Sequence, residues 1–317
     1  MNKIIFLQIL LTATSTSFAC YTFAQTPAQS IIGNTKSPYD QSATSNSLPG
    51  NLYGRFSQKI ESKYFVFYSN LPQSAVQEFA HFADMFLDLI DRDFIKLKVT
   101  RKVNAVVLST KDEFKRFSVQ QLNVSRPSEY GMYLRDKNLF VTYAGSGLGT
   151  FTHEIMHFVV ELMLPNRPMW AIEGIPEFFE KFYGYEENGK LRLKWGFQNP
   201  WRIQALGGSI LTLKMADVIN KPDGGSEKRL LSVFIYQHGK FKPFLDLIKK
   251  GNKRGFPTYV EAAFNKPLNE IEVEWERYLS NIYANRDRIY RLPSSTYFKT
   301  EQEYSAFEKA NFLAFQN

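Results

Sequence analysis

Cysteine and histidine are scarce in this sequence of 317 residues, which contains one cysteine and four histidines. A single cysteine excludes an internal disulfide, so stability in an oxidising compartment must come from the core or from a bound metal. Long hydrophobic runs are also absent, because no stretch approaches the roughly 18 apolar residues of a membrane-spanning helix. We therefore expect no transmembrane segment.

The sequence has no block of basic residues of the kind that binds nucleic acid, although Lys and Arg outnumber Asp and Glu by 39 to 31. The net charge of +8 is spread along the chain. A mildly basic, solvated surface is one interpretation, and weak attraction to an anionic cell envelope is the other. Hydrophobic residues make up 44% of the chain and aromatic residues 15%, which indicates a globular protein with a sizeable core.

The N-terminus resembles a secretory signal peptide. Lys3 precedes the apolar run Ile4–Leu11, and Thr22-Phe23-Ala24 supplies small residues for cleavage after Ala24. We therefore predict a signal peptide over residues 1–24 and export to the periplasm or beyond, with Cys20 removed. Residues 25–55 are rich in small and polar side chains and predict a flexible leader.

Periodic structure begins after this leader. The patterns predict strands over 64–68 and 103–108 and a hairpin of 132–134 with 139–143, in which 139–143 forms a sheet edge. They also predict an amphipathic helix after Pro72, a short helix opened by Ser109 and Asp112, and helices near 150–164 and 172–182. Later helices are expected near 227–237, 242–250, 257–264 and 270–283. The expected fold is α+β, with a small mixed sheet in a domain over 56–190 and a mainly helical part over 191–317.

The run His153-Glu154-Ile155-Met156-His157 is the strongest chemical signal. Residues four apart on a helix share one face, so the two imidazoles converge on one point with Glu154 beside them. Neutral imidazoles suit Zn²⁺, and an adjacent carboxylate can accept a proton from a water on the metal. The alternative is a buried structural pair, but placing such polar groups beside a core without a partner would cost several kcal/mol.

Zinc needs a third protein ligand, and Glu173 is the residue we predict for this role. The chain between His157 and Glu173 is long enough to end one helix, turn at Pro165 and start a second helix against the first. Glu177, one turn further, is predicted to orient a ligand histidine. A solvated helical carboxylate is the alternative for both glutamates. We expect one Zn²⁺ per chain.

These motifs resemble the gluzincin metallopeptidases, in particular the bacterial peptidase MA-like proteins. The resemblance rests on His-Glu-x-x-His followed by Trp170-x-x-Glu173-Gly174-x-x-Glu177, and it extends from the strand near Tyr64 to the signature Glu274–Leu279. It implies a zincin-like fold in which His153, His157 and Glu173 bind zinc and Glu154 is the catalytic base. The implied activity is hydrolysis of a peptide or protein substrate. Apart from the resemblance, we expect an extended substrate to add to the predicted edge strand 139–143.

One departure from the family pattern concerns the group that stabilises the oxyanion. Family members usually carry a Tyr-x-x-Ser stretch where this chain has Asp223-Gly224-Gly225-Ser226-Glu227. Tyr236 and His238 are nearby, but an ordinary helical role is the better interpretation of both. Two other functions therefore stay open. One is a catalytically inactive zinc-binding envelope protein, and the other is an interaction domain without metal.

Overall fold

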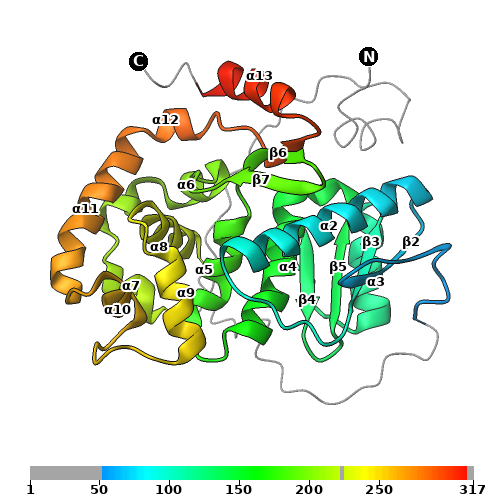
Figure 1. Cartoon of the computed structure of the whole chain (residues 1–317), viewed down its shortest axis with the longest axis horizontal. Coiled ribbons are helices and arrows are strands. Elements are labelled where there is room, and N and C mark those ends of the chain that lie inside the picture. The colour runs from blue at the N-terminus through cyan, green and yellow to red at the C-terminus, as the bar shows by residue number, and fades with distance from the viewer. Residues whose placement is uncertain (1–51, 222–224, 313–317) are drawn as a thin grey trace. The chain divides into compact units, whose positions relative to one another are not determined.

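The computed structural model describes residues 52–221 and 225–312 (Figure 1). The predicted signal peptide, residues 25–51 of the predicted leader, and Asp223 with Gly224 lie outside these residues. Among the described residues, no helix combines the length and the apolar character needed to cross a membrane.

The larger sheet has five strands in the order β1-β2-β3-β5-β4. Strands β2, β3 and β5 are parallel, and β1 and β4 run antiparallel to their neighbours. The bounds are β1 Gln58–Glu61, β2 Phe65–Ser69, β3 Val103–Leu108, β4 Gly131–Leu134 and β5 Leu139–Tyr143. The predicted hairpin of β4 and β5 is confirmed, but the prediction that β5 forms an edge is wrong. β5 pairs with β3 as well as β4, and its five residues are all buried. The edge on this side of the sheet is β4, and β1 is the edge on the other side.

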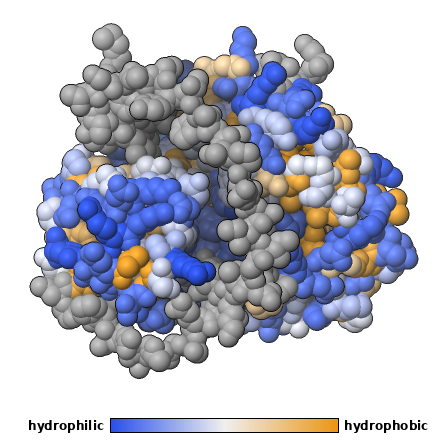
Figure 2. Space-filling model, turned by 180° about the vertical axis from the view of Figure 1, so that it is seen from behind, coloured by the Kyte–Doolittle hydropathy of each residue, from blue (hydrophilic) through white to orange (hydrophobic). Residues whose placement is uncertain are grey.

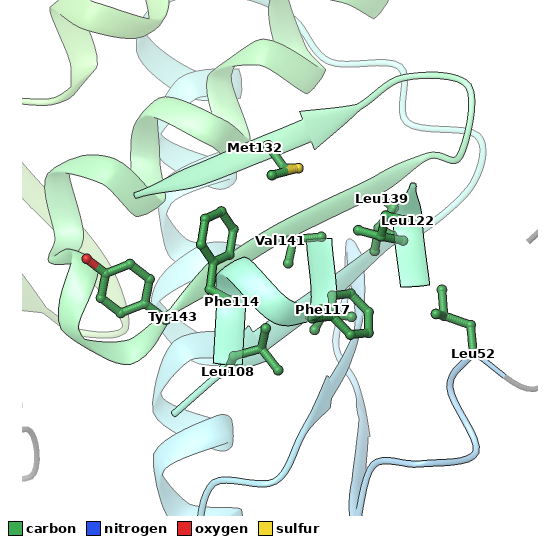
Figure 3. Close-up of a cluster of buried hydrophobic side chains, with 10 residues drawn as sticks. Leu52, Leu108, Phe114, Phe117, Leu122, Met132, Leu139, Val141 and Tyr143 are labelled. Carbon is green, nitrogen blue, oxygen red and sulfur yellow. The ribbon is translucent and has the colours of Figure 1, made fainter. Parts of the chain in front are cut away.

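Helices cover both faces of this sheet. Successive side chains of a strand point to opposite faces, so each central strand places buried residues under the helices on both sides. Val106 and Val141 point to the face covered by α3, where they join the hydrophobic cluster of Figure 3. Phe67 and Phe140 point to the opposite face, where they contact Phe151 of α4. The helix that carries the two histidines is thereby fixed against the sheet by aromatic packing.

Helices dominate the chain after the sheet, as the sequence predicts, and the α+β class is confirmed. The helices that pack on the sheet are α2 Gln73–Asp93, α3 Lys111–Leu122 and α4 Leu148–Met163. The later helices are α5 Met169–Phe179, α6 Pro200–Leu206, α7 Met215–Asn220, α8 Ser226–Gln237, α9 Phe241–Lys250, α10 Tyr259–Phe264, α11 Leu268–Ala284, α12 Arg286–Ile289 and α13 Glu301–Asn311, with short 3₁₀ turns η1 Ala144–Ser146 and η2 Gly207–Thr212. Figure 1 shows α7 to α11 gathered on one side of the sheet, with α4 and α5 between them.

A second, three-stranded sheet was not predicted. It consists of β6 Tyr183–Glu187, β7 Lys190–Lys194 and β8 Thr296–Phe298 in the order β7-β6-β8. The predicted boundary between the two domains, after residue 190, falls inside β7. Strand β6 lies before this boundary and pairs with β7 and β8, which lie at and after it. Residues on both sides of the predicted domain boundary therefore belong to one sheet.

Candidate metal centre

Helices α4 and α5 pack against each other and supply the three predicted ligands. His153 and His157 lie one turn apart on α4, and both are more than nine-tenths buried. Pro168 precedes α5, and Glu173 lies in the second turn of that helix. The Thr152 hydroxyl donates to the carbonyl of Phe179 at 2.8 Å, which fixes the end of α5 against α4.

The ligand atoms of these three residues lie within 4.8 Å of one another. The two Nε2 atoms of His153 and His157 are 2.9 Å apart, and Oε2 of Glu173 lies 3.6 Å and 3.7 Å from them. Ligands of a tetrahedral zinc ion at about 2.0–2.1 Å are separated by roughly 3.3 Å. The three atoms therefore have the spacing and the chemical identity of a zinc ligand set, and small shifts would fit them around an ion.

Glu154 is buried beside this cluster, and one of its oxygens has no hydrogen-bond partner among the described residues. Burial raises the pKa of Glu154 to about 8, against the opposing charge of His153, while Glu173 and Glu180 raise it further and a backbone hydrogen bond from Tyr133 lowers it. An unpartnered buried carboxylate is costly in a purely structural role. The raised pKa also makes the ionised form of Glu154 a stronger base toward a molecule that enters the site.

Gly131 makes room for Glu154 at the start of the edge strand. A Cβ atom built at Gly131 would lie 3.0 Å from Cγ and 3.3 Å from Oε1 of Glu154. The Gly131 position therefore sets how closely β4 and α4 approach. Gly131 could not be predicted from the sequence, because nothing in a single sequence shows which strand meets Glu154.

Glu180, rather than Glu177, contacts a histidine of this cluster. Its Oε1 lies 3.0 Å from Nδ1 of His153, so Nε2 of His153 remains directed to the metal cluster. The predicted orienting residue, Glu177, instead accepts a hydrogen bond from Arg202 at 2.6 Å. The physical reason is that Glu180 is the C-terminal cap of α5, where the chain turns toward His153.

The two histidines differ in their protonation because only one of them has this carboxylate. Burial alone would lower the pKa of His153, but the hydrogen bond and charge of Glu180, with the charges of Glu154 and Glu173, raise it to about 9. Burial lowers the pKa of His157 to about 4. His157 is therefore neutral at pH 7, as a metal ligand must be, whereas His153 would have to lose a proton to bind a metal.

Arg202 of α6 joins the two outer glutamates. It donates to Glu180 at 2.5 Å and 2.9 Å and to Glu177 at 2.6 Å, and Asn199 donates to Glu180 at 3.1 Å. Burial and the neighbouring charge of Glu180 hold the pKa of Glu177 near 8 against the effect of Arg202. The pKa of Glu180 is lowered because Arg202 and His153 outweigh its burial. No local pattern in the sequence predicts the roles of Arg202, Asn199 and Glu180.

The residue after Glu173 is Gly174, and its surroundings leave no room for a side chain. The Gly174 carbonyl accepts a hydrogen bond from Ser232 of α8 at 2.6 Å. A Cβ atom at this position would lie 2.8 Å from the Trp170 ring and 3.2 Å from the carbonyl of Lys228. The glycine therefore allows α8 to approach α5 at the turn that carries Glu173.

Tyr236 and His238 lie in other surroundings. Tyr236 packs against Phe178 and Phe241, and His238 contacts Phe234 and Glu274. Both have ordinary helical and packing contacts, which agrees with the interpretation favoured from the sequence.

On the face shown in Figure 2 most visible side chains are hydrophilic, and a hollow with hydrophilic walls opens near the middle.

Comparison with known proteins adds no assignment to this geometry. No protein-family model matches the chain, and no curated protein matches it at a significant level.

Proposed function

We propose that this protein is a zinc-dependent peptidase of the gluzincin type, with a zincin-like fold and one Zn²⁺ per chain. The observation that carries the proposal is the convergence of His153, His157 and Glu173 from two packed helices, with the buried carboxylate of Glu154 beside them. In this proposal each of these four residues takes the role that the family resemblance implies. An exported location, in the periplasm or outside the cell, remains part of the proposal.

Zinc at this site would polarise a peptide carbonyl and lower the pKa of a bound water to about 7. Glu154 would accept the proton of the attacking water and pass it to the leaving amine. Glu180 would hold His153 in the orientation that leaves Nε2 for the metal. Arg202 would keep Glu180 charged and in place.

The edge strand supports a peptide as the substrate. Strand β4 is unpaired on its outer side among the described strands, and Gly131 at its start lies against Glu154. An extended peptide can add to such an edge through backbone hydrogen bonds. A peptide paired with β4 would pass close to Glu154, which is where the scissile bond must lie.

The test of this proposal is Glu154→Gln, which removes the base and preserves the size of the side chain. We expect zinc content to stay at about one per chain and peptide hydrolysis to fall by roughly 10²–10⁴-fold. Glu161→Gln, on the same helix but in contact with Arg135 and Arg167, is the matched control and should retain activity. Hydrolysis at the wild-type rate by zinc-loaded Glu154→Gln protein would refute the role of Glu154.

A second function is favoured by the surroundings of Tyr236 and His238. Neither contacts the metal cluster, and no other oxyanion donor is assigned among the described residues. A removed oxyanion donor costs about 3 kcal/mol or more of transition-state stabilisation. A zinc-binding protein without turnover, in which the metal stabilises the fold or a partner site, is therefore the alternative. It predicts bound zinc, a large loss of stability on chelation, and no cleavage of peptides by the wild type.

A further inference from the structure

Two separate segments of the sequence carry the whole net charge of the protein. Residues 94–102 and 240–256 contain ten Lys and Arg side chains and one acidic residue, Asp246. The remainder of the chain has 29 cationic and 30 acidic residues and is close to neutral. The ten cationic residues, called here the basic surface, are Lys96, Lys98, Arg101, Lys102, Lys240, Lys242, Lys249, Lys250, Lys253 and Arg254.

Folding places these two segments side by side. The Lys242 ammonium donates to the carbonyl of Phe94 at 3.2 Å, and the Lys249 ammonium donates to the carbonyl of Lys96 at 2.8 Å. Lys242 and Lys249 are two turns apart on α9, so this helix runs along the segment that follows α2 (Figure 1). A charge that is spread along the sequence is therefore concentrated on one part of the folded protein.

Few carboxylates neutralise the basic surface. Lys96 pairs with Asp91 at 3.3 Å, and Lys102 pairs with Glu61 at 3.3 Å. The other eight cationic residues have no salt bridge within the described part of the chain. Most of these side chains are exposed, Lys98, Arg101 and Lys250 among them. A positive potential over this region is the result, and it extends about 8–10 Å into a solution of physiological ionic strength.

The composition of the basic surface indicates what kind of anion it fits. Lys outnumbers Arg by eight to two, whereas recognition of bases favours the planar fork of Arg. No large hydrophobic or aromatic side chain is exposed in either segment, so there is neither a platform for stacked bases nor an apolar core for a protein interface. Mobile lysine charges on an open surface match a layer of anionic headgroups.

The geometry points to the basic surface as a docking site for an anionic lipid bilayer, independent of the proposed metal site. Binding of this kind is electrostatic and peripheral, with no helix inserted into the bilayer. Each cationic side chain near an anionic bilayer strengthens binding about fivefold. Eight cationic residues without a salt bridge among the described residues are enough for binding that is reversible and sensitive to salt.

The test is sedimentation of the purified protein with vesicles of phosphatidylglycerol and phosphatidylcholine at a 3:7 ratio, beside vesicles of phosphatidylcholine alone. We expect binding to the anionic vesicles only, and loss of that binding between 50 mM and 500 mM NaCl. The triple variant Lys98→Glu, Arg101→Glu, Lys250→Glu should weaken binding by at least about 100-fold. The matched control is the triple variant Arg116→Glu, Arg126→Glu, Arg277→Glu. It reverses three charges at exposed residues outside the basic surface.

Three results would overturn the inference. One is equal binding to neutral and anionic vesicles, and another is an equal loss of binding in the two triple variants. The third is tighter binding to double- or single-stranded DNA than to anionic vesicles at the same salt concentration, with the same triple variant weakening it. That third result would identify a nucleic acid as the partner. Circular dichroism of both triple variants checks that each is folded.

Discussion

Oε1 of Glu180 lies 3.0 Å from Nδ1 of His153 and accepts a hydrogen bond from Arg202 at 2.5 Å. This contact connects a metal-ligand candidate on α4 to a cation on α6 through the end of α5. Loss of a carboxylate that orients a ligand histidine lowers metal affinity by about 10–100-fold in comparable sites. We therefore predict that Glu180→Gln lowers the affinity for zinc by this amount.

The matched control for this prediction is Glu177→Gln, which changes the other glutamate held by Arg202. Among the described residues, Glu177 pairs with Arg202 and is not seen in contact with a histidine ring, so zinc affinity should change by no more than a few-fold. Competition with a chromophoric chelator measures both variants. A larger effect of Glu177→Gln than of Glu180→Gln would restore the prediction made from the sequence and contradict the structure.

Arg202 is expected to be essential for stability. It is 7% exposed and holds two buried carboxylates in place. Removing one partner of a buried ionic network typically costs 3–5 kcal/mol, because the remaining charges lose their compensation. We predict that Arg202→Met lowers the free energy of unfolding by about this amount in urea denaturation of metal-free protein. Arg202→Lys retains the positive charge without the bidentate geometry, so it should lower the free energy of unfolding by less than Arg202→Met does.

The affinity for zinc should depend on pH in a direction fixed by His153. Its pKa in the metal-free protein is raised to about 9 by Glu180, against the effect of burial, so His153 carries a proton at pH 7 that the metal must displace. Affinity should therefore rise by roughly tenfold per pH unit between pH 7 and pH 9 and level off above. Calorimetry in two buffers with different ionisation enthalpies should show release of at least one proton at pH 7.

The Glu180→Gln variant serves as the control for this pH profile. Without the negative charge of Glu180, the pKa of His153 should fall, and the slope between pH 7 and pH 9 should decrease. An affinity for zinc that is constant from pH 7 to pH 9 in the wild type would show that His153 is not protonated in the metal-free site.

Gly131→Ala tests the placement of the proposed base without changing any ligand. The added Cβ would lie 3.0 Å from Cγ of Glu154, so either the glutamate or β4 must shift by a few tenths of an ångström. Displacement of a catalytic group by about 1 Å can reduce the rate by about 10²-fold, so this smaller shift should cost about a few-fold. We predict that zinc content is retained while peptide hydrolysis falls by a few-fold. Unchanged kcat and KM would mean that Glu154 is free to move at this position.

Much of the fold could be predicted because local patterns determine it. The spacing of apolar residues from Val76 to Ile90 defined α2, and the apolar run Val103–Leu108 defined β3 with its observed bounds. The hairpin of β6 and β7 was missed although Asn188-Gly189 has the positive φ values of a tight hairpin turn. β8 has three residues and pairs with β6 across more than 100 residues of sequence, so no local signal predicts it.

In the candidate site, too, the residues placed by local spacing were predicted and those placed by tertiary packing were not. His153 and His157 share a helical face by spacing alone, and one helical turn after a short connection brings Glu173 to them. The contact between Glu180 and His153 depends on how α5 ends, and the contact with Arg202 depends on where α6 packs. Helix ends and the packing of distant helices are set by tertiary contacts, which explains why the sequence pointed to Glu177 instead.

The most direct test of the account is the zinc content of the purified protein, measured by atomic emission after dialysis against metal-free buffer, with His157→Ala beside it. We predict about one zinc per wild-type chain and none in His157→Ala protein that circular dichroism shows to be folded. Folded, chelator-free wild-type protein that neither contains zinc nor takes it up would contradict the metal site, the role of Glu154 and the proposed peptidase together.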